Sequence, residues 1–392
     1  MKLAKRIGNI KPSAIRAVGK KITAIDNCIS FAAGLPDPAL FPSKEMKEVT
    51  DCLLTEKPHI ALQYGMTKGY APLIAKIVND LNGRNIDCNV ANIQMTTGSQ
   101  QGISFVGMAF LDPGDVVLTE NPTYLGALAA FRPYEVILKG VDSESDGMKM
   151  DALEDALKNN PRTKLIYLVP TFSNPSGRTW SIDKRKAVIQ LANQYDVVII
   201  EDNPYGDIRF EGEHLPTLKS LDTEERVVYL GSYSKILCAG LRVGYICAEQ
   251  NLVQKIEIIK EGADLQTNQL AQMQVDELLE KIDLDAHIGK VISAYKEKRD
   301  LMMACIEKYF PKNIKYTCPE GGMFLWLELP EKMDANVILD KSLLQKVGFV
   351  PGGPFFPEGN NENTIRLNFS TTPKNNIEPG IKILGRVLDE AG

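Results

Sequence analysis

The amino-acid sequence predicts an α/β protein. We expect a large domain with a mainly parallel seven-stranded sheet flanked by helices, and a smaller α+β domain built from both chain ends. Three observations lead to this fold class. Apolar runs in the middle of the chain are continuous rather than alternating, as in strands buried on both faces. Amphipathic segments separate these runs, which favours parallel strands joined by helical crossovers. Beyond residue 284 the pattern changes to long helices and alternating strands.

The strands of the large sheet are expected at the apolar runs 93–96, 116–119, 165–169, 197–201, 227–230 and 243–247. Between them, residues 99–111 and 181–195 place apolar side chains on one helical face, and Ser181 is the predicted N-cap of the second segment. Asp151 and Glu154 fit a capping box at the start of another helix. Ligands of such folds bind at the carboxyl ends of the strands, so we expect the functional side chains there.

The smaller domain is predicted from the two ends of the chain. A helix over roughly 285–310 precedes two strand patterns, GGMFLWLELP and TIRLNFS, and a helix near 376–390 follows. We therefore divide the chain into an N-terminal segment, 1–45, that packs with the small domain, a large cofactor-binding domain, 46–284, and a small C-terminal α+β domain, 285–392.

Composition argues against several classes of function. The net charge of −5 leaves no basic surplus for neutralising nucleic-acid phosphates. Seven scattered cysteines without a CxxC pair argue against disulfides and a zinc site, and indicate a reducing cytoplasm. No apolar run has membrane-spanning length, and the N-terminus lacks the apolar core of a secretory signal. With three histidines, none near a cysteine or carboxylate cluster, we expect no metal centre.

The strongest chemical signal is a lysine at the end of a predicted strand. Ser232 and Ser234 precede Lys235, and Arg242 follows seven residues later. Hydroxyl groups and a guanidinium suit a phosphate, whose oxygens arginine binds in pairs. A lysine beside that anion can form an imine with a carbonyl group of the same ligand. Although a lone lysine would be read as a surface residue, this combination describes pyridoxal phosphate.

A carboxylate is predicted to lie beneath the same ligand. Asp202 ends the apolar run 197–201, and burying its charge is costly unless it is paired. It is either an ordinary strand-end aspartate or the partner of a protonated pyridine nitrogen, which makes the cofactor an electron sink. Tyr205, three residues later, can donate to the phenolic oxygen of the cofactor and lower the pKa of the imine.

Four further residues follow predicted strands or lie within one. Ser99 opens a helix after Gly98, which is either a plain N-cap or an anion site. Tyr124 and Asn174 lie in Asn-Pro segments that would pass as turns, or they stack on the pyridine ring and bind its phenolic oxygen. Arg366 is either solvent-facing or the fork that grips a substrate α-carboxylate.

In this order along the chain, these segments resemble fold-type I pyridoxal-phosphate enzymes of the aspartate aminotransferase superfamily. The segments FAAGLP, QYG, GSQQ and PGGPFF further resemble its 2-aminoadipate/kynurenine aminotransferase subgroup. The resemblance covers nearly the whole chain. Cys238 departs from it, because it stands where the family commonly has proline, and we interpret it as a small buried hydrophobe.

The resemblance implies a role for each residue. Lys235 forms the internal aldimine and shuttles the proton, and Asp202 holds the ring nitrogen. Tyr205 and Asn174 bind the phenolic oxygen, while Tyr124 stacks on the ring. The phosphate would be bound by Ser99, Gln100, Ser232, Ser234 and Arg242. Tyr64 would reach the cofactor phosphate of the neighbouring subunit, which implies a homodimer with shared active sites.

The substrate side is less determined by the sequence. Arg366, the Gly34 backbone and Asn174 would bind the α-carboxylate of an L-amino acid of 2-aminoadipate, glutamate, aromatic or branched-chain type. The amino group would pass to a 2-oxo acid such as 2-oxoglutarate by a ping-pong mechanism. Arg16 either meets a distal carboxylate or is simply exposed. A fold-type I lyase or decarboxylase would share these residues. An aminotransferase-like regulator would need a DNA-binding domain, for which the residues before Phe31 are too few.

Overall fold

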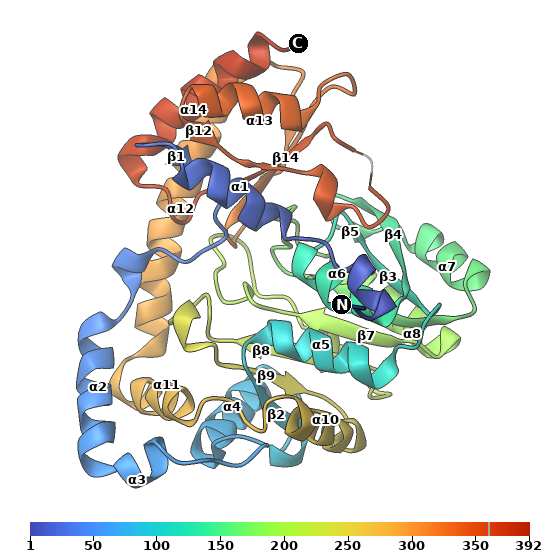
Figure 1. The fold of residues 1–392 in the computed structure, drawn as a ribbon, viewed down its shortest axis with the longest axis vertical. Helices are drawn as coiled ribbons and strands as arrows, with labels where there is room; N and C mark the ends of the chain where they lie inside the picture. The colour runs from blue at the N-terminus through green and yellow to red at the C-terminus, as the bar shows by residue number, and fades with distance from the viewer. Residues whose placement is uncertain (360) are drawn as a thin grey trace.

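The computed structural model describes residues 1–359 and 361–392 of the chain. A large twisted sheet lies at its centre, and a smaller layer of helices and strands packs against one end (Figure 1). The order in the large sheet is β2-β9-β8-β7-β6-β3-β4-β5. Its strands are β2 Ile93–Thr96, β9 Gly244–Cys247, β8 Val227–Ser232, β7 Val198–Asp202, β6 Thr163–Leu168, β3 Val116–Asn121, β4 Ile137–Glu144 and β5 Gly147–Met148.

The mainly parallel sheet expected from the sequence is confirmed. Strands β4, β3, β6, β7 and β8 run parallel to one another, whereas β9 is antiparallel to both of its neighbours. The two-residue strand β5 adds an eighth, antiparallel member at one edge to the seven that were expected. Apolar runs alone did not reveal β4, because most of its side chains are exposed or half-buried.

Helices cover both faces of this sheet, and alternate strand residues point to opposite faces. Leu165 and Tyr167 of β6 belong to the core beneath one layer of helices, while Ile166 and Leu168 belong to the core beneath the other. The first layer contains α4 Ala71–Gly83, α5 Ser99–Phe110, α6 Leu125–Phe131, α10 Gln250–Ala263 and α11 Gln269–Lys281. The second contains α7 Met150–Asn159, α8 Ile182–Tyr195 and α9 Leu218–Leu221.

The two predicted helix starts have different outcomes. Ser181 is the N-cap of α8, and its hydroxyl accepts from the Lys184 amide at 3.4 Å. The capping box at Asp151 is wrong, because α7 already begins at Met150 with Lys149 in the cap position. The Asp151 carboxylate instead accepts from the Ala152 amide at 2.8 Å inside the first turn.

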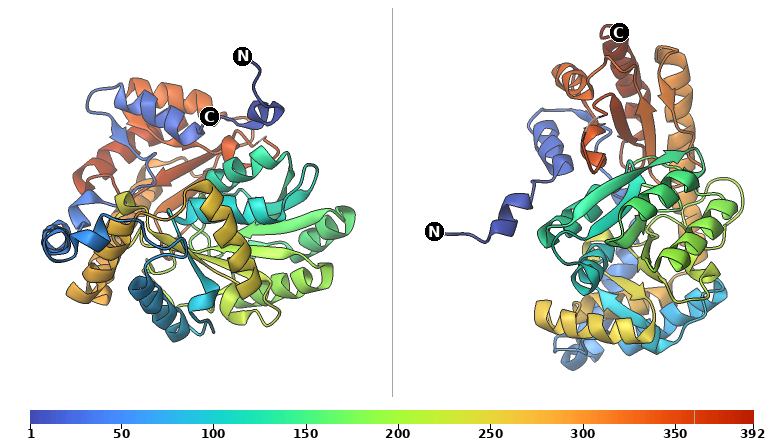
Figure 2. Two further views of the ribbon diagram at one scale, coloured as in Figure 1. Left: turned by 60° about the horizontal axis from the view of Figure 1, so that its bottom comes forward. Right: turned by 90° about the vertical axis from the view of Figure 1, so that its right-hand side faces the viewer.

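Residues 14–30, near the beginning of the chain, lie beside its C-terminal part (Figure 2). Strand β1, Ile29–Ser30, pairs in parallel with β12, Val347–Gly348. A separate four-stranded antiparallel sheet contains β10 Lys315–Tyr316, β11 Phe324–Glu328, β14 Thr364–Asn368 and β13 Val350–Pro351. The helices of this layer are α1 Ala14–Thr23, α12 Leu284–Tyr309, α13 Ala335–Leu344 and α14 Lys374–Asp389, whereas α2 Ser43–Glu56 and α3 Pro58–Ala61 pack against α11. The domain boundaries given above remain a proposal.

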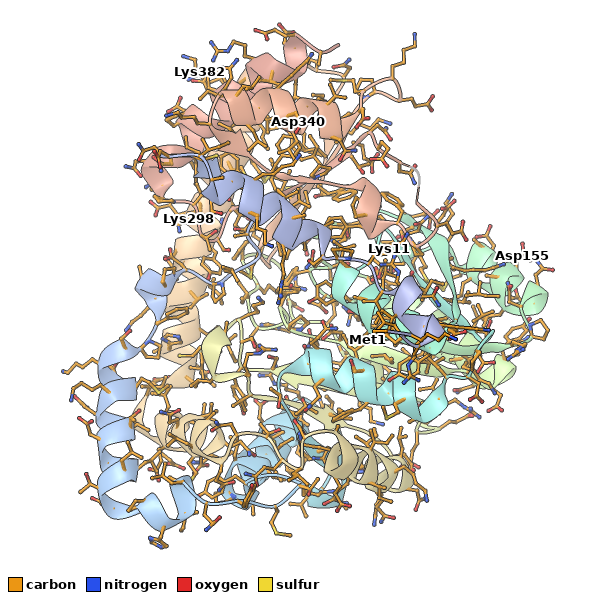
Figure 3. The ribbon with its side chains drawn as sticks, viewed as in Figure 1. Met1, Lys11, Asp155, Lys298, Asp340 and Lys382 are labelled. Carbon is orange, nitrogen blue, oxygen red and sulfur yellow. The ribbon has the colours of Figure 1, made fainter. Side chains whose placement is uncertain are left out.

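Short 3-10 helices complete the chain: η1 Lys5–Asn9, η2 Pro38–Leu40, η3 Val90–Asn92, η4 Arg132–Tyr134, η5 Ala239–Leu241 and η6 Gly353–Phe355. The N-terminal segment, in which Figure 3 labels Met1 and Lys11, packs its helix η1 against η4. No helix in the described part of the chain combines the length and the apolar character that a membrane crossing requires.

Candidate active site

The carboxyl ends of the parallel strands meet at one edge of the large sheet, and the predicted site residues follow these ends. Lys235, three residues after β8, is partly buried, and its Nζ donates to the Gly34 carbonyl at 2.9 Å. Burial lowers the pKa of Lys235 to about 8, and the nearby cations Arg242 and Arg366 add to this effect. A sizeable fraction of this amine is therefore neutral, and so nucleophilic, near neutral pH.

Asp202 lies at the end of β7 with a buried carboxylate. The Tyr167 hydroxyl donates to its Oδ2 at 2.8 Å, whereas its Oδ1 has no hydrogen-bond partner in the described structure. Burial raises the pKa of Asp202 to about 6, against the lowering effects of the Tyr167 and Ser99 hydroxyls and of the Lys235 charge. A buried carboxylate oxygen without a donor is costly, so Oδ1 marks the place of a cationic or N–H group from a ligand.

An anion site lies where the turn before α5 meets Arg242. Gly98 takes a positive φ of 75°, and Ser99 is the first helical residue. Arg242 Nη1 donates to the Ser234 hydroxyl at 3.3 Å, and Nη2 donates to the Thr97 carbonyl at 3.4 Å. A Cβ atom on Gly98 would lie 2.2 Å from Arg242 Nη2, so only glycine allows this approach.

The remaining serine joins this anion site. The Ser232 hydroxyl donates to that of Ser234 at 2.9 Å and accepts from the Ser234 amide at 3.1 Å. A helix N-terminus, two hydroxyl groups and a guanidinium together form a site suited to a phosphate.

Two tyrosines and two amides lie near Asp202 and Arg366. The Tyr124 hydroxyl donates to Gln100 Oε1 at 3.3 Å, and Gln100 Nε2 donates to the Gly126 carbonyl at 2.8 Å. Asn174 Nδ2 donates to the Tyr205 hydroxyl at 3.4 Å. Burial raises the pKa of both tyrosines, so each stays a neutral hydroxyl that can donate to a ligand oxygen.

Arg366 on β14 is a buried cation above this space. Its Nη1 donates to Asn174 Oδ1 at 2.9 Å and its Nη2 to the Ala32 carbonyl at 2.7 Å, while Nε has no partner. The guanidinium lies 4.4 Å from the centre of the Phe324 ring. Burial lowers the pKa of Arg366 to about 10. No carboxylate among residues 1–359 and 361–392 pairs with it, so the site is suited to an anionic ligand.

The other predicted residues take different positions. Arg16 on α1 is exposed and lines a cleft of about 830 Å³ together with Gln100, Tyr124 and Arg242. Tyr64 is 78% exposed and does not line this cleft. Cys238 is half-buried and is the N-cap residue of η5.

Sequence reasoning missed Tyr167, which holds the carboxylate of Asp202. Both residues lie on neighbouring parallel strands, in which Tyr167 pairs with Ile200. That register could not be read from one sequence, because the apolar runs do not specify how strands align. The described residues contain no group of three His, Cys, Asp or Glu side chains that could hold a metal ion.

Comparisons with known proteins place this site in a family. The family model "Aminotransferase class I and II" matches residues 26–384. Aromatic-amino-acid aminotransferase 1 of Thermococcus litoralis is 42% identical over 386 residues, which cover 97% of this chain and 92% of that protein. A 2-aminoadipate transaminase of Thermus thermophilus is 41% identical over 387 residues, covering 98% of this chain and 96% of that protein.

Solved structures of aminotransferases are similar to this chain over nearly its whole length. A kynurenine aminotransferase of Pyrococcus horikoshii, in complex with PMP, has a TM-score of 0.94 at 37% identity and covers 99% of this chain and 97% of its own. An alpha-aminoadipate aminotransferase of Thermus thermophilus, complexed with N-(5'-phosphopyridoxyl)-L-leucine, has a TM-score of 0.92 at 40% identity, covering 99% and 97%. The chain therefore belongs to the class I and II aminotransferase family and is a transaminase, and its fold is that of fold-type I enzymes.

Family membership implies a requirement for pyridoxal 5'-phosphate, and the residues present fit this group. The partnerless Asp202 oxygen suits a protonated pyridine nitrogen. The anion site at Ser99 and Arg242 suits the phosphate, and the Lys235 amine suits the aldehyde.

The Asp202 pKa gives a stability prediction. The folded-state pKa of about 6 lies above the ordinary value of 3.8, so cofactor-free protein loses stability as pH rises from about 4 to about 6. The Asp202→Asn variant lacks this loss. We expect it to gain, relative to the parent, on the order of 3 kcal/mol between pH 4 and pH 7, while its pyridoxal-phosphate affinity falls. Thermal unfolding across this pH range, without cofactor, measures the difference; a constant offset at all pH values would contradict the prediction.

Proposed function

We propose that this transaminase moves the amino group of an L-amino acid to a 2-oxo acid such as 2-oxoglutarate, with pyridoxal 5'-phosphate as cofactor and a ping-pong order. The donors proposed are 2-aminoadipate, glutamate, and aromatic and branched-chain amino acids. One observation carries the proposal: the Lys235 amine lies in a site that also holds a buried, unpaired carboxylate at Asp202 and a buried, unpaired guanidinium at Arg366.

The cofactor would be held by the groups described above. Ser99, Gln100, Ser232, Ser234 and Arg242 bind the phosphate. Asp202 binds the ring nitrogen and Tyr124 stacks on the ring, while Tyr205 and Asn174 donate to the phenolic oxygen. When bound, the cofactor supplies an electron sink that weakens the bonds at the substrate Cα.

The substrate would be held through its α-carboxylate by residues on the side of the small sheet. Arg366 grips the α-carboxylate with its guanidinium fork, supported by Asn174 and the Gly34 backbone. This orients the amino acid so that its Cα–H bond faces Lys235. The lowered pKa of Lys235, about 8, then allows its neutral amine to accept the Cα proton and to return a proton to the cofactor carbon. Both substrates use this one carboxylate site in turn, as a ping-pong order requires.

We also propose a homodimer and a cytoplasmic location. Four large apolar side chains are exposed along the segment around Tyr64: Leu54, Ile60, Leu62 and Met66. Several exposed apolar side chains on one segment favour a protein–protein interface there. In a homodimer the Tyr64 hydroxyl would reach the cofactor phosphate of the other subunit. Seven free cysteines fit a reducing compartment.

A donor panel tests the function. We expect purified protein with pyridoxal phosphate to form glutamate from 2-oxoglutarate with at least one proposed donor, and the most efficient donor identifies the physiological class. The Lys235→Ala variant should still bind pyridoxal phosphate through Ser99, Ser232 and Arg242, but lose turnover by a factor of roughly 10³ or more, since it loses both the covalent and the general-base contribution. Near-normal turnover in Lys235→Ala would overturn the assignment.

The role of Arg16 is tested with donors that carry a distal carboxylate. Because Arg16 lines the cleft that contains Gln100, Tyr124 and Arg242, we propose that it pairs with the side-chain carboxylate of 2-aminoadipate or glutamate. Arg16→Ala should lower kcat/KM for these donors about tenfold relative to leucine. Arg6→Ala, an exposed arginine outside the cleft, serves as the matched control. An unchanged ratio of kcat/KM between these donors and leucine in Arg16→Ala would exclude this role for Arg16.

A further inference from the structure

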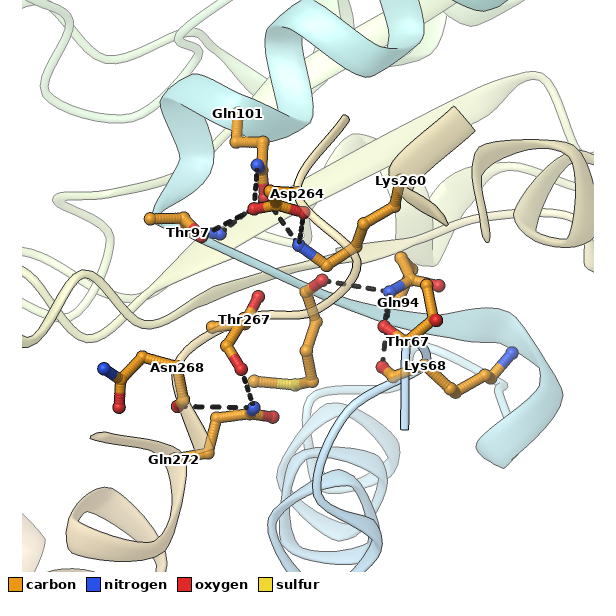
Figure 4. A network of polar contacts seen from close by, with 11 residues as sticks. Thr67, Lys68, Gln94, Thr97, Gln101, Lys260, Asp264, Thr267, Asn268 and Gln272 are labelled. Carbon is orange, nitrogen blue, oxygen red and sulfur yellow. Dashed lines mark hydrogen bonds and ion pairs between the residues drawn. The ribbon is translucent and has the colours of Figure 1, made fainter. Parts of the chain in front are cut away.

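A polar network around one buried lysine adjoins the turn that opens α5 (Figure 4). At its centre is Lys260 of α10, whose side chain has no exposed surface. Its Nζ donates to Gln101 Oε1 at 3.0 Å and pairs with Asp264 Oδ1 at 2.8 Å. The Lys260 ammonium also lies 5.7 Å from the centre of the Phe105 ring. Lys260 therefore ties helix α10 to the first turn of α5.

Gln101 and Asp264 both form hydrogen bonds with Thr97. Gln101 Oε1 accepts from the Thr97 amide at 2.8 Å, and Gln101 Nε2 donates to Asp264 Oδ2 at 2.7 Å. The Thr97 hydroxyl donates to the same carboxylate oxygen at 3.4 Å. The network thus holds Thr97 by both its backbone and its side chain.

Thr97 contacts Arg242 of the anion site and adjoins the N-terminus of α5. Its carbonyl accepts from Arg242 Nη2 at 3.4 Å, and it directly precedes Gly98 and Ser99. A Cβ atom on Gly98 would lie 2.2 Å from Arg242, and one on Gly244 would lie 2.9 Å from the Gly98 backbone. With so little clearance, a small shift of this turn changes the spacing between the helix N-terminus and the guanidinium.

The buried charge of Lys260 carries a desolvation cost that filling the space between the helices would not require. A buried ammonium loses its hydration, and burial lowers the pKa of Lys260 against the opposing effect of Asp264. An apolar side chain would fill the space without that penalty. Directional hydrogen bonds to two acceptors, in contrast, fix the position of Gln101. None of Lys260, Asp264 and Gln101 lines the cleft that contains Gln100, Tyr124 and Arg242.

We propose that Lys260, acting through Asp264 and Gln101, is a positioning residue for the phosphate group of the cofactor. It holds the Thr97–Gly98–Ser99 turn at the spacing from Arg242 that a phosphate requires, and it touches neither substrate nor cofactor. The inference rests on the proposed function, because it requires pyridoxal phosphate to bind with its phosphate at the N-terminus of α5.

The test compares pyridoxal phosphate with pyridoxal, which has the same ring and aldehyde but no phosphate. Dissociation constants of both compounds are measured from the absorbance of the bound ligand on full-length, cofactor-free protein. The variants are Lys260→Met and Asp264→Asn. Lys298→Met is the matched control, since Lys298 (labelled in Figure 3) is also a buried lysine, bonded to Asp37 at 2.6 Å and to the Ser370 carbonyl at 2.7 Å.

The preference for pyridoxal phosphate over pyridoxal is expected to fall about tenfold in Lys260→Met and in Asp264→Asn. It should change less than about twofold in Lys298→Met. The Asp264→Asn variant distinguishes a positioning effect from a direct effect of charge on phosphate binding. Removing a negative charge near the phosphate would by itself strengthen phosphate binding, whereas removing an acceptor from the network weakens it. If Lys260→Met does not fold, Asp264→Asn alone decides.

An unchanged preference in both variants overturns the positioning role, as does a rise in Asp264→Asn. An equal fall in Lys298→Met also overturns it, because the effect would then be one of general destabilisation. Failure of the proposed function looks different: the parent protein itself would not bind pyridoxal phosphate more tightly than pyridoxal.

Discussion

The site is governed by charges that the protein buries without opposite charges of its own. Asp202 and Arg366 are both almost completely buried, and neither forms an ion pair within residues 1–359 and 361–392. Lys235 lies in the same electrostatic environment, since Arg242 and Arg366 both lower its pKa while Asp202 raises it. Burying a charge in this way is unfavourable unless a ligand supplies the missing partner. A cofactor with a cationic ring nitrogen and a substrate with a carboxylate would supply both.

The fold makes this arrangement possible by bringing three regions of the chain together. Asp202 and Lys235 follow neighbouring parallel strands, whereas Arg366 comes from the small sheet. The segment after β1 joins them, because its carbonyls at Ala32 and Gly34 accept from Arg366 and Lys235. The N-terminal part of the chain is thus a structural element of the site.

The sequence predicted the chemistry of the site better than its geometry. Lys235, Asp202 and Arg242 could be found because a lysine after hydroxyls, a carboxylate after an apolar strand and a later arginine each suit one part of one ligand. Tyr167 could not be found, because its contact with Asp202 depends on strand register. Nor could the Lys260 network, because its members are far apart in sequence and are ordinary helix residues in composition. Strand β4 was missed for lack of burial, and the antiparallel direction of β9 leaves no mark in an apolar run.

The ligand charges should complete this site for amino transfer rather than for another reaction at Cα. The most direct measurement is a single half-reaction on the loaded enzyme, with an amino acid supplied and no 2-oxo acid. About one equivalent of 2-oxo acid should form per active site, and formation should then stop until added 2-oxoglutarate restores the original absorbance. Continuous release of carbon dioxide or ammonia from the amino acid alone, with no need for a 2-oxo acid, would instead show a lyase or a decarboxylase.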